Sequence, residues 1–331
     1  MTETYDITII GGGPAGMFAA FYAGMNNAKT QLVESLAELG GQVNALYPEK
    51  TILDVAGFPA VSGRDLIANQ QRQLDQFPLT IKTGQAVTNV TATDDGFAIT
   101  TAAGTTQSRA VIIAVGNGAF TPRKLNVTNA ADFEGSHLFY SVRDLEHFRG
   151  HDVMVAGGGD AAIDQALMLE KVAKSVTLLH RRDQFRGLPH MVDLLRASSV
   201  TVQTPYLIRD LQATSDDRLA VTLKQVGSSA EMAQVTVDDL VVSYGFTADH
   251  HVLDAWDVDL AEDHRLIAVD STMATSVPGI YAIGDGVSYP GKQPLIATGY
   301  GEAPVAVRDI MTRYFPDRRG PVHSTSLSDQ H

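Results

Sequence analysis

One pattern occurs twice in this chain at a constant offset of 146 residues, the first time near the N-terminus. An apolar segment from Tyr5 to Ile10 ends in a glycine-rich turn, and a helical pattern and a second apolar segment that stops at Glu34 follow. The turn consists of Gly11, Gly12, Gly13, Pro14, Ala15 and Gly16. In such a turn the first glycine allows a tight bend, the second lets a pyrophosphate approach, and the third lets the helix pack on the strand. The helix N-terminus would donate to phosphates and Glu34 would bind ribose hydroxyls, so a dinucleotide site is predicted; a plain glycine-rich turn is the alternative.

The second copy begins after His151. It has an apolar strand over 152–156, a predicted helix over 163–171 and a second strand over 175–179 that stops at His180. Its turn consists of Gly157, Gly158, Gly159, Asp160, Ala161 and Ala162. The offset that carries Gly11 to Gly157 also carries Glu34 to His180, so the two copies align without a gap. A second dinucleotide site is therefore predicted.

The two copies differ in the residues that would meet the ribose. Where the first copy has an acid, the second has His180, Arg181 and Arg182, with Arg186 four residues further on. An acidic group favours a free 2′-hydroxyl, whereas arginines make charge-assisted hydrogen bonds to a 2′-phosphate. The first site is thus predicted to take FAD or NAD(H) and the second NADP(H). The alternative is that the arginines form a solvated surface cluster.

The rest of the chain predicts an α/β fold with two Rossmann-like, three-layer dinucleotide-binding domains, one inserted in the other. A length of 331 residues suits two domains. Further buried strands are expected at 110–116, 239–245 and 279–285, and a helix at 302–314. The predicted FAD-binding domain comprises 1–117 and 248–331, including a C-terminal extension at 316–331, and the NADP-binding domain comprises 118–247.

Composition and charge exclude several classes of function. The chain has no cysteine, which excludes disulfides, thiolate metal sites and thiol redox pairs. The net charge of −13 argues against nucleic-acid and anionic-membrane binding, and no apolar run is long enough to span a membrane. The acidic N-terminus leads directly into a strand, so we expect a cytoplasmic protein. No metal site is expected, because His250 and His251 lack a third ligand at a suitable spacing.

The chain resembles the pyridine nucleotide–disulfide oxidoreductase superfamily, because one nucleotide fold is inserted in another and a late strand ends in Gly284-Asp285. The second glycine turn and the arginine segment resemble thioredoxin reductases, but the region where those enzymes carry their Cys pair, 140–148, has no thiol. Other motifs resemble the thioredoxin-reductase-like ferredoxin–NADP⁺ reductases. These motifs are Leu39-Gly-Gly-Gln42, Leu46-Tyr-Pro-Glu-Lys50, Asp54-Val-Ala-Gly-Phe-Pro59, residues 116–124, Gly301-Glu-Ala-Pro304 and His323-Ser-Thr-Ser-Leu327.

This resemblance implies roles for matching residues. Glu34 would bind the adenosine ribose of FAD, and the rest of the cofactor would be surrounded by Gln42, the backbone near Val87 and Phe120, Asp285 and Ser326. Tyr47 would stack on one face of the flavin, and His323 on the other, in its own subunit or a partner's. Read without the resemblance, Tyr47 could be a turn anchor, Asp285 a helix cap and His323 part of a disordered tail.

The resemblance also implies the activity. It indicates an FAD enzyme that passes electrons between NADP(H) and ferredoxin or flavodoxin by hydride transfer to flavin N5, and a homodimer. Ferredoxins are usually acidic, so docking would need a basic patch, for which the candidates are Arg123, Lys124, Arg308, Arg313, Arg318 and Arg319. A reductase of quinones, flavins or dyes and an NADPH sensor without turnover remain alternatives.

Overall fold

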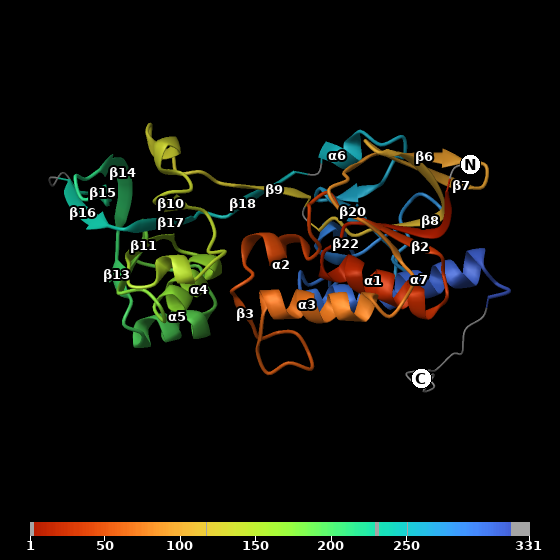
Figure 1. The fold of residues 1–331 in the computed structure, drawn as a ribbon, viewed down its shortest axis with the longest axis horizontal. Coiled ribbons are helices and arrows are strands. Elements are labelled where there is room, and N and C mark those ends of the chain that lie inside the picture. Colours follow the sequence, from red (N-terminus) through yellow and green to blue (C-terminus); the bar gives the residue numbers. More distant parts are fainter. Residues whose placement is uncertain (1–2, 117, 229–231, 250, 319–331) are drawn as a thin grey trace. The chain divides into compact units, whose positions relative to one another are not determined.

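The first strand of each sequence repeat lies between two parallel neighbours in a sheet, and each of the two sheets belongs to a separate unit of the chain (Figure 1). The computed structural model describes residues 3–116, 118–228, 232–249 and 251–318. Unit 1 comprises Met1–Asn44, Ile52–Ala119 and Asp249–His331, and unit 2 comprises Ala45–Thr51 and Phe120–Ala248. The short segment Ala45–Thr51 groups with unit 2, where Lys50 Nζ lies 2.6 Å from a carboxylate oxygen of Asp164.

Unit 1 contains a seven-stranded mixed sheet in the order β5-β2-β1-β8-β7-β6, with β21 also paired to β8. The pairs of β1 with β2 and β8 are parallel, and β6, β7 and β8 are antiparallel. The strands are β1 (Thr4–Ile10), β2 (Thr30–Val33), β5 (Thr80–Lys82), β6 (Val87–Thr93), β7 (Gly96–Thr101), β8 (Gly104–Ile113) and β21 (Ile280–Ala282). The predicted strands at 5–10 and 31–33 are confirmed. The strand expected at 110–116 begins earlier and ends at Ile113, and the one expected at 279–285 is shorter, from Ile280 to Ala282.

Helices cover one face of the unit 1 sheet. Helix α1 (Pro14–Met25) packs against both α3 (Gly63–Leu74) and α7 (Ile296–Tyr314) (Figure 1). On the other face, apolar side chains of β6 to β8 form a core with Leu253, Trp256 and Ile267. The smaller elements are α2 (Gly41–Leu46), β3 (Thr51–Ile52), β4 (Val61–Ser62), α6 (His251–Asp254), β19 (Glu262–Asp263), β20 (Leu266–Ala268), η3 (Gly284–Gly286) and β22 (Val287–Ser288).

The helix predicted at 302–314 begins six residues earlier, at Ile296. The added turns contain Gly299 and Gly301, although glycine weakens a helix interior. In the fold Gly299 serves packing instead: an ideal Cβ on it would lie 3.0 Å from the Cβ of Ala15 in α1. The glycine therefore permits α7 to approach the first glycine turn.

Unit 2 contains a five-stranded parallel sheet in the order β10-β17-β11-β12-β13. Its central part repeats unit 1, since β11 lies between β12 and β17 as β1 lies between β2 and β8. The strands are β10 (Leu138–Phe139), β11 (Asp152–Gly157), β12 (Ser175–Leu179), β13 (Thr201–Gln203) and β17 (Asp239–Ser243). The strands predicted at 152–156 and 175–179 are thus confirmed, and the strand expected at 239–245 ends earlier, at Ser243.

Unit 2 has three layers because alternate residues of its strands point to opposite faces. Val153 and Val155 pack with α4 (Asp160–Leu169) and α5 (Pro189–Ala197). Met154 and Ala156 pack against an antiparallel sheet made of β14 (Tyr206–Ala213), β15 (Leu219–Gln225) and β16 (Ala233–Val237). Two short 3₁₀ helices, η1 (Ala130–Phe133) and η2 (Glu146–Phe148), complete the unit, and β9 (Ala119–Pro122) pairs with β18 (Phe246–Asp249). Within the described part of the chain, no helix has the length and apolar character to cross a membrane.

Candidate nucleotide-binding sites

The glycine turn of unit 1 is so tight that it has no room for a side chain at two of its positions. Gly11 has a φ of 109°, and an ideal Cβ on it would lie 2.4 Å from the carbonyl oxygen of Ala114. A Cβ on Gly16 would lie 1.9 Å from the carbonyl oxygen of Gly11. Helix α1 begins at Pro14 with Gly13 as its cap, so no cap side chain competes for the N–H groups of the first turn. These features fit a pyrophosphate, which would accept from those N–H groups.

Glu34 lies directly beside this turn. Its side chain is buried, and its Oε2 accepts a hydrogen bond of 2.6 Å from the Gly12 N–H. Its other carboxylate oxygen accepts from the Leu36 N–H at 2.8 Å and from the Ser35 hydroxyl at 3.0 Å. The structure thus brings Glu34 to the glycine turn, as its place at the end of β2 predicts. The carboxylate also holds the turn in shape, which the sequence pattern does not reveal.

The corresponding turn of unit 2 has the same backbone plan. An ideal Cβ on Gly157 would lie 2.6 Å from the Ala162 Cβ and from the Ser243 carbonyl oxygen. Helix α4 starts at Asp160 after Gly159, which is again a cap without a side chain. The Asp160 carboxylate accepts the Leu188 N–H at 2.7 Å, which ties the following loop to the start of the helix.

His180 takes the place that Glu34 has in unit 1. Its ring covers Gly158, where an ideal Cβ would lie 2.1 Å from the ring Cε1, and it stacks on Phe185 with a centroid distance of 5.4 Å. Burial first, and then the nearby charges of Arg181 and Arg186, lower the pKa of His180. His180 is therefore a neutral, packed ring, and its Nε2 is buried without a hydrogen-bond partner among the described residues.

The three arginines lie on the loop after β12 and are exposed. The Arg186 N–H donates to the Gly158 carbonyl oxygen at 2.7 Å, which fixes this loop beside the glycine turn. In the described ranges no ion pair is formed by the guanidinium groups of Arg181, Arg182 and Arg186. Guanidinium groups without an ion-pair partner among the described residues, next to the glycine turn, are a donor set that would suit a 2′-phosphate.

A buried ion pair in unit 1 joins Lys292 to Glu302 of α7. This pair was not predicted from the sequence. Glu302 of α7 accepts from Lys292 Nζ at 2.5 Å, the Gly284 N–H at 2.6 Å and the Tyr289 hydroxyl at 2.7 Å. Burial and the bond to Glu302 raise the pKa of Tyr289 to about 12, so the phenol stays a donor. The only sequence signal was Glu302 inside Gly301-Glu-Ala-Pro304, a carboxylate amid small residues of a helix.

This network positions Asp285, which lies in the turn η3. The carboxylate is partly buried, and no described residue donates a hydrogen bond to it. Burial and the charge of Glu302 raise the pKa of Asp285, against the opposing effect of Lys292. A partly buried carboxylate with no donor among the described residues fits a ligand hydroxyl, such as that of the ribityl chain of FAD.

The other predicted residues are placed as follows. Gln42 lies in the first turn of α2, Val87 is the buried first residue of β6, and Phe120 belongs to β9. Tyr47 follows α2 in the segment that groups with unit 2, and Lys50 Nζ lies 5.9 Å from its ring centroid. His323 and Ser326 lie outside the described residues. The roles of all these residues therefore stay predictions.

Comparison with known proteins agrees with this geometry. Residues 5–309 match the family model described as pyridine nucleotide-disulphide oxidoreductase. A Levilactobacillus brevis protein named ferredoxin–NADP reductase is 73% identical over 330 residues, covering 100% of both chains. A protein of the same name from Lactiplantibacillus plantarum is 56% identical over 331 residues, also covering 100% of both chains.

Solved structures show the same fold. Thioredoxin reductase of T. acidophilum superposes with a TM-score of 0.79 at 23% identity, over 94% of this chain and 98% of that one. The Lactococcus lactis thioredoxin reductase superposes with a TM-score of 0.77 at 25% identity, over 93% and 98% of the two chains. The two repeated nucleotide folds, the family match over most of the length and the full-length relatives show that this chain belongs to the pyridine nucleotide-disulphide oxidoreductase family.

Proposed function

We propose that this protein is an FAD-dependent ferredoxin–NADP⁺ reductase, which transfers electrons between NADP(H) and ferredoxin or flavodoxin. One observation carries the proposal: two equivalent glycine turns are bordered by opposite chemistry, a buried carboxylate at Glu34 and exposed arginines after His180. The names of the two relatives of 73% and 56% identity support the same activity.

In unit 1 the residues at hand fit FAD. The first turn of α1 would donate to the pyrophosphate, Glu34 would accept from the adenosine ribose and Asp285 from a ribityl hydroxyl. When bound, the flavin supplies the ability to accept a hydride and to release single electrons. The protein would contribute position, exclusion of water and electrostatics. Gln42, Val87 and Phe120 would border the cofactor, Ser326 would contact it, and Tyr47 and His323 would cover its ring.

In unit 2 the residues fit NADP(H). Arg181, Arg182 and Arg186 would bind the 2′-phosphate, while the N–H group of Ala161 at the start of α4 would donate to the pyrophosphate. His180 would act through its shape, because its ring fills the space over Gly158. An acidic side chain at the same position would repel a 2′-phosphate. No thiol step is included, since the chain has no cysteine.

The first test is anaerobic, NADPH-driven reduction of cytochrome c with and without ferredoxin, with NADH as the control donor. We expect a large ferredoxin-dependent rate that falls sharply with NADH. A rate that ferredoxin does not increase would replace the carrier by another acceptor such as a quinone, flavin or dye. Bound FAD and nucleotide without turnover would favour a sensor.

The resemblance implies the assembly, and the sequence pattern implies the location. We infer a cytoplasmic homodimer that binds neither nucleic acid nor membrane, in keeping with the net charge of −13. Light scattering on the purified protein tests the dimer, and a monomer at micromolar concentration would contradict it. Truncation after Val322 tests the cover over the flavin: faster nicotinamide access is expected, and unchanged kinetics would remove His323 from the site.

A further inference from the structure

Two histidine side chains meet around a buried carboxylate in unit 2. Asp239, the first residue of β17, is buried, with a side-chain exposure of 2%. His151 Nδ1 lies 2.7 Å from its Oδ2, and His147 Nε2 lies 3.3 Å from its Oδ1. One ligand atom from each of the three residues lies within 4.8 Å of the other two. This set does not include the His250-His251 pair that was considered and rejected as a metal site from the sequence.

We propose that His147, His151 and Asp239 bind a divalent first-row transition ion, Zn²⁺ in particular. Two imidazoles and one carboxylate are a preferred donor set for zinc, and three protein ligands leave room for water. Tetrahedral donors at zinc bond lengths lie roughly 3.3 Å apart, so the three groups need to move by about an ångström to enclose the ion. The histidine side chains are 41% and 40% exposed, which gives the ion access from solvent.

The ligands are held in place before any ion binds. The His147 ring meets those of Phe139 and Phe148 edge-on, with centroid distances of 4.9 and 4.8 Å. It also meets the His151 ring at 5.6 Å. Asp239 pairs with Val153 in the parallel sheet, so its backbone cannot move freely. A site on packed rings and a sheet strand binds a metal with less loss of conformational freedom than one on a loose loop.

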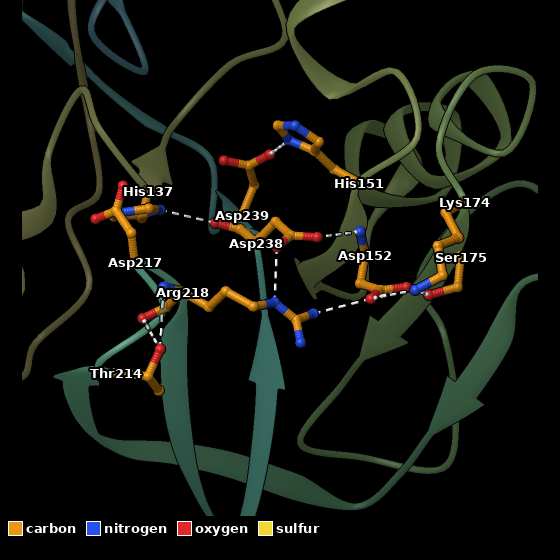
Figure 2. A network of polar contacts seen from close by, with 10 residues as sticks. All are labelled: His137, His151, Asp152, Lys174, Ser175, Thr214, Asp217, Arg218, Asp238 and Asp239. Carbon is orange, nitrogen blue, oxygen red and sulfur yellow. Dashed lines mark hydrogen bonds and ion pairs between the residues drawn. The ribbon is translucent and has the colours of Figure 1, made fainter.

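The surrounding charges favour a cation (Figure 2). The Arg218 guanidinium is already used: its Nε donates to Asp238 at 2.7 Å and its Nη2 to Asp152 at 2.8 Å. The carboxylates of this group are Asp152, Asp217, Asp238 and Asp239, and its cationic side chains are Arg218 and Lys174. The four carboxylates outnumber the two cationic side chains, and a divalent ion would reduce this excess of negative charge.

The site lies at the opposite end of the strands from the nucleotide turn. In the parallel pair of β11 and β17, Val153 lies beside Asp239 and Gly157 beside Ser243. Four residues of strand are about 13 Å, so the ion would not touch NADP(H). The ion would link the segment around η2, which carries His147, to strand β17, which carries Asp239. We therefore assign the ion a role in the stability of unit 2 rather than in electron transfer.

Direct titration tests the proposal. The full-length protein is treated with a chelator, dialysed and titrated with Co²⁺, which reports its ligands by visible absorption, and Zn²⁺ is then added as competitor. We expect ligand-field bands that saturate at one ion per chain and disappear with Zn²⁺. In His147→Gln and His151→Gln the Co²⁺ affinity should fall at least about 100-fold, since even outer-shell partners of a metal are worth 10–100-fold.

His264→Gln is the matched control, because His264 is also beside a carboxylate, Asp263 at 3.7 Å, but is 91% exposed and in unit 1. This variant should bind Co²⁺ as the wild type does. Absence of bands in the wild type, or equal binding by the wild type and both ligand variants, would overturn the proposal. A second readout needs no variant: Zn²⁺ should raise the melting temperature of the wild type while leaving the KM for NADPH unchanged, and no rise would overturn the proposal as well.

Discussion

At the scale of single residues, Gly12 and Gly158 occupy equivalent positions in the two glycine turns but contact different kinds of side chain. Gly12 donates its N–H to the carboxylate of Glu34, whereas Gly158 is covered by the ring of His180. Both side chains stand at the end of the second strand of their repeat. The first interaction is a hydrogen bond to a charge, and the second is packing of a ring whose pKa burial lowers.

Packing at Gly158 leads to a first prediction. In Gly158→Ala the new methyl group would meet the His180 ring at 2.1–2.3 Å, so we expect a loss of about 1–3 kcal/mol in unfolding free energy. Urea denaturation measures it. In the double variant Gly158→Ala/His180→Ala much of this loss should be restored, because the clash is removed. A double variant whose loss in unfolding free energy equals the sum of the losses in Gly158→Ala and His180→Ala would contradict the predicted contact.

The exposed arginines carry a second prediction. Arg181→Gln/Arg182→Gln should lower kcat/KM for NADPH by about 10–150-fold, as expected when charged hydrogen bonds of 1.5–3 kcal/mol are lost. The value for NADH should change little. Arg196→Gln in α5 is the control, since Arg196 is exposed but pairs with Asp193. An equal loss with both nucleotides would contradict recognition of a 2′-phosphate.

Asp285 supplies a third prediction, on pH. Because its folded pKa is raised, the carboxylate costs stability at neutral pH, and that cost disappears as pH falls through the folded pKa toward the unfolded value of 3.8. Asp285→Asn should therefore stabilise the flavin-free protein at pH 7 by about 0.5–2 kcal/mol and bind FAD more weakly. Urea melts at pH 7 and pH 4 and flavin titration measure both effects. A less stable variant at pH 7 would show that the carboxylate is not strained by burial.

At the scale of elements, α7 connects the last strand of unit 1 to its first glycine turn. Its Gly299 allows contact with Ala15, and its Glu302 holds the loop from Gly284 to Lys292. The side chains of Lys292 and Glu302 are only 10% and 3% exposed. A helix that appears peripheral in sequence therefore fixes the turn that carries Asp285.

The ion pair of α7 gives a fourth prediction. Glu302→Gln removes the charge but keeps the shape, which leaves the buried ammonium of Lys292 unpaired, at a cost of about 3–5 kcal/mol in unfolding free energy. Guanidinium denaturation measures it. Adding Lys292→Met should recover most of the loss, because no isolated charge then remains. Equal stability of Glu302→Gln and wild type would mean that the pair is solvated in solution.

At the scale of the whole molecule, net charge and local pairing decide how a protein partner approaches. The chain carries −13, and several cations proposed for docking are already paired. Lys124 pairs with Glu134 and Arg313 with Asp309, each at 2.7 Å, and Arg318 pairs with Asp6. Arg319 lies outside the described residues. A strong basic docking patch is therefore not supported by these side chains.

A fifth prediction follows from that charge. For an acidic ferredoxin, long-range repulsion should slow encounter at low salt, so kcat/KM for ferredoxin should rise as NaCl is raised to about 0.15 M, where the Debye length is near 8 Å. Stopped-flow or steady-state assays over a salt series measure it, with cytochrome-free NADPH oxidation by a neutral dye as control. A fall with salt would indicate local attraction that outweighs the net charge.

The local patterns determined much of this protein. The repeat from Gly11 to Glu34 and from Gly157 to His180 predicted two parallel βαβ units, and the structure confirms them, because glycine positions and apolar strands act over a few residues. The absence of cysteine excluded thiol chemistry without any structure. The end of helix α7 at Tyr314 was predicted, but its start at Ile296 was not, since glycine weakens a helix and the contact of Gly299 with Ala15 exists only in the fold.

Only the tertiary structure decided which distant groups share a site. Glu302 and Gly284 are 18 residues apart and Asp239 and His151 are 88 apart, so no local spacing relates them. The burial of Glu302 and Asp239, and hence the need of each carboxylate for a cation or donors, depends on packing of whole elements. Local propensity fixes where strands and turns form, but the low-dielectric surroundings that make a charge chemically significant exist only once the sheets and helices have assembled.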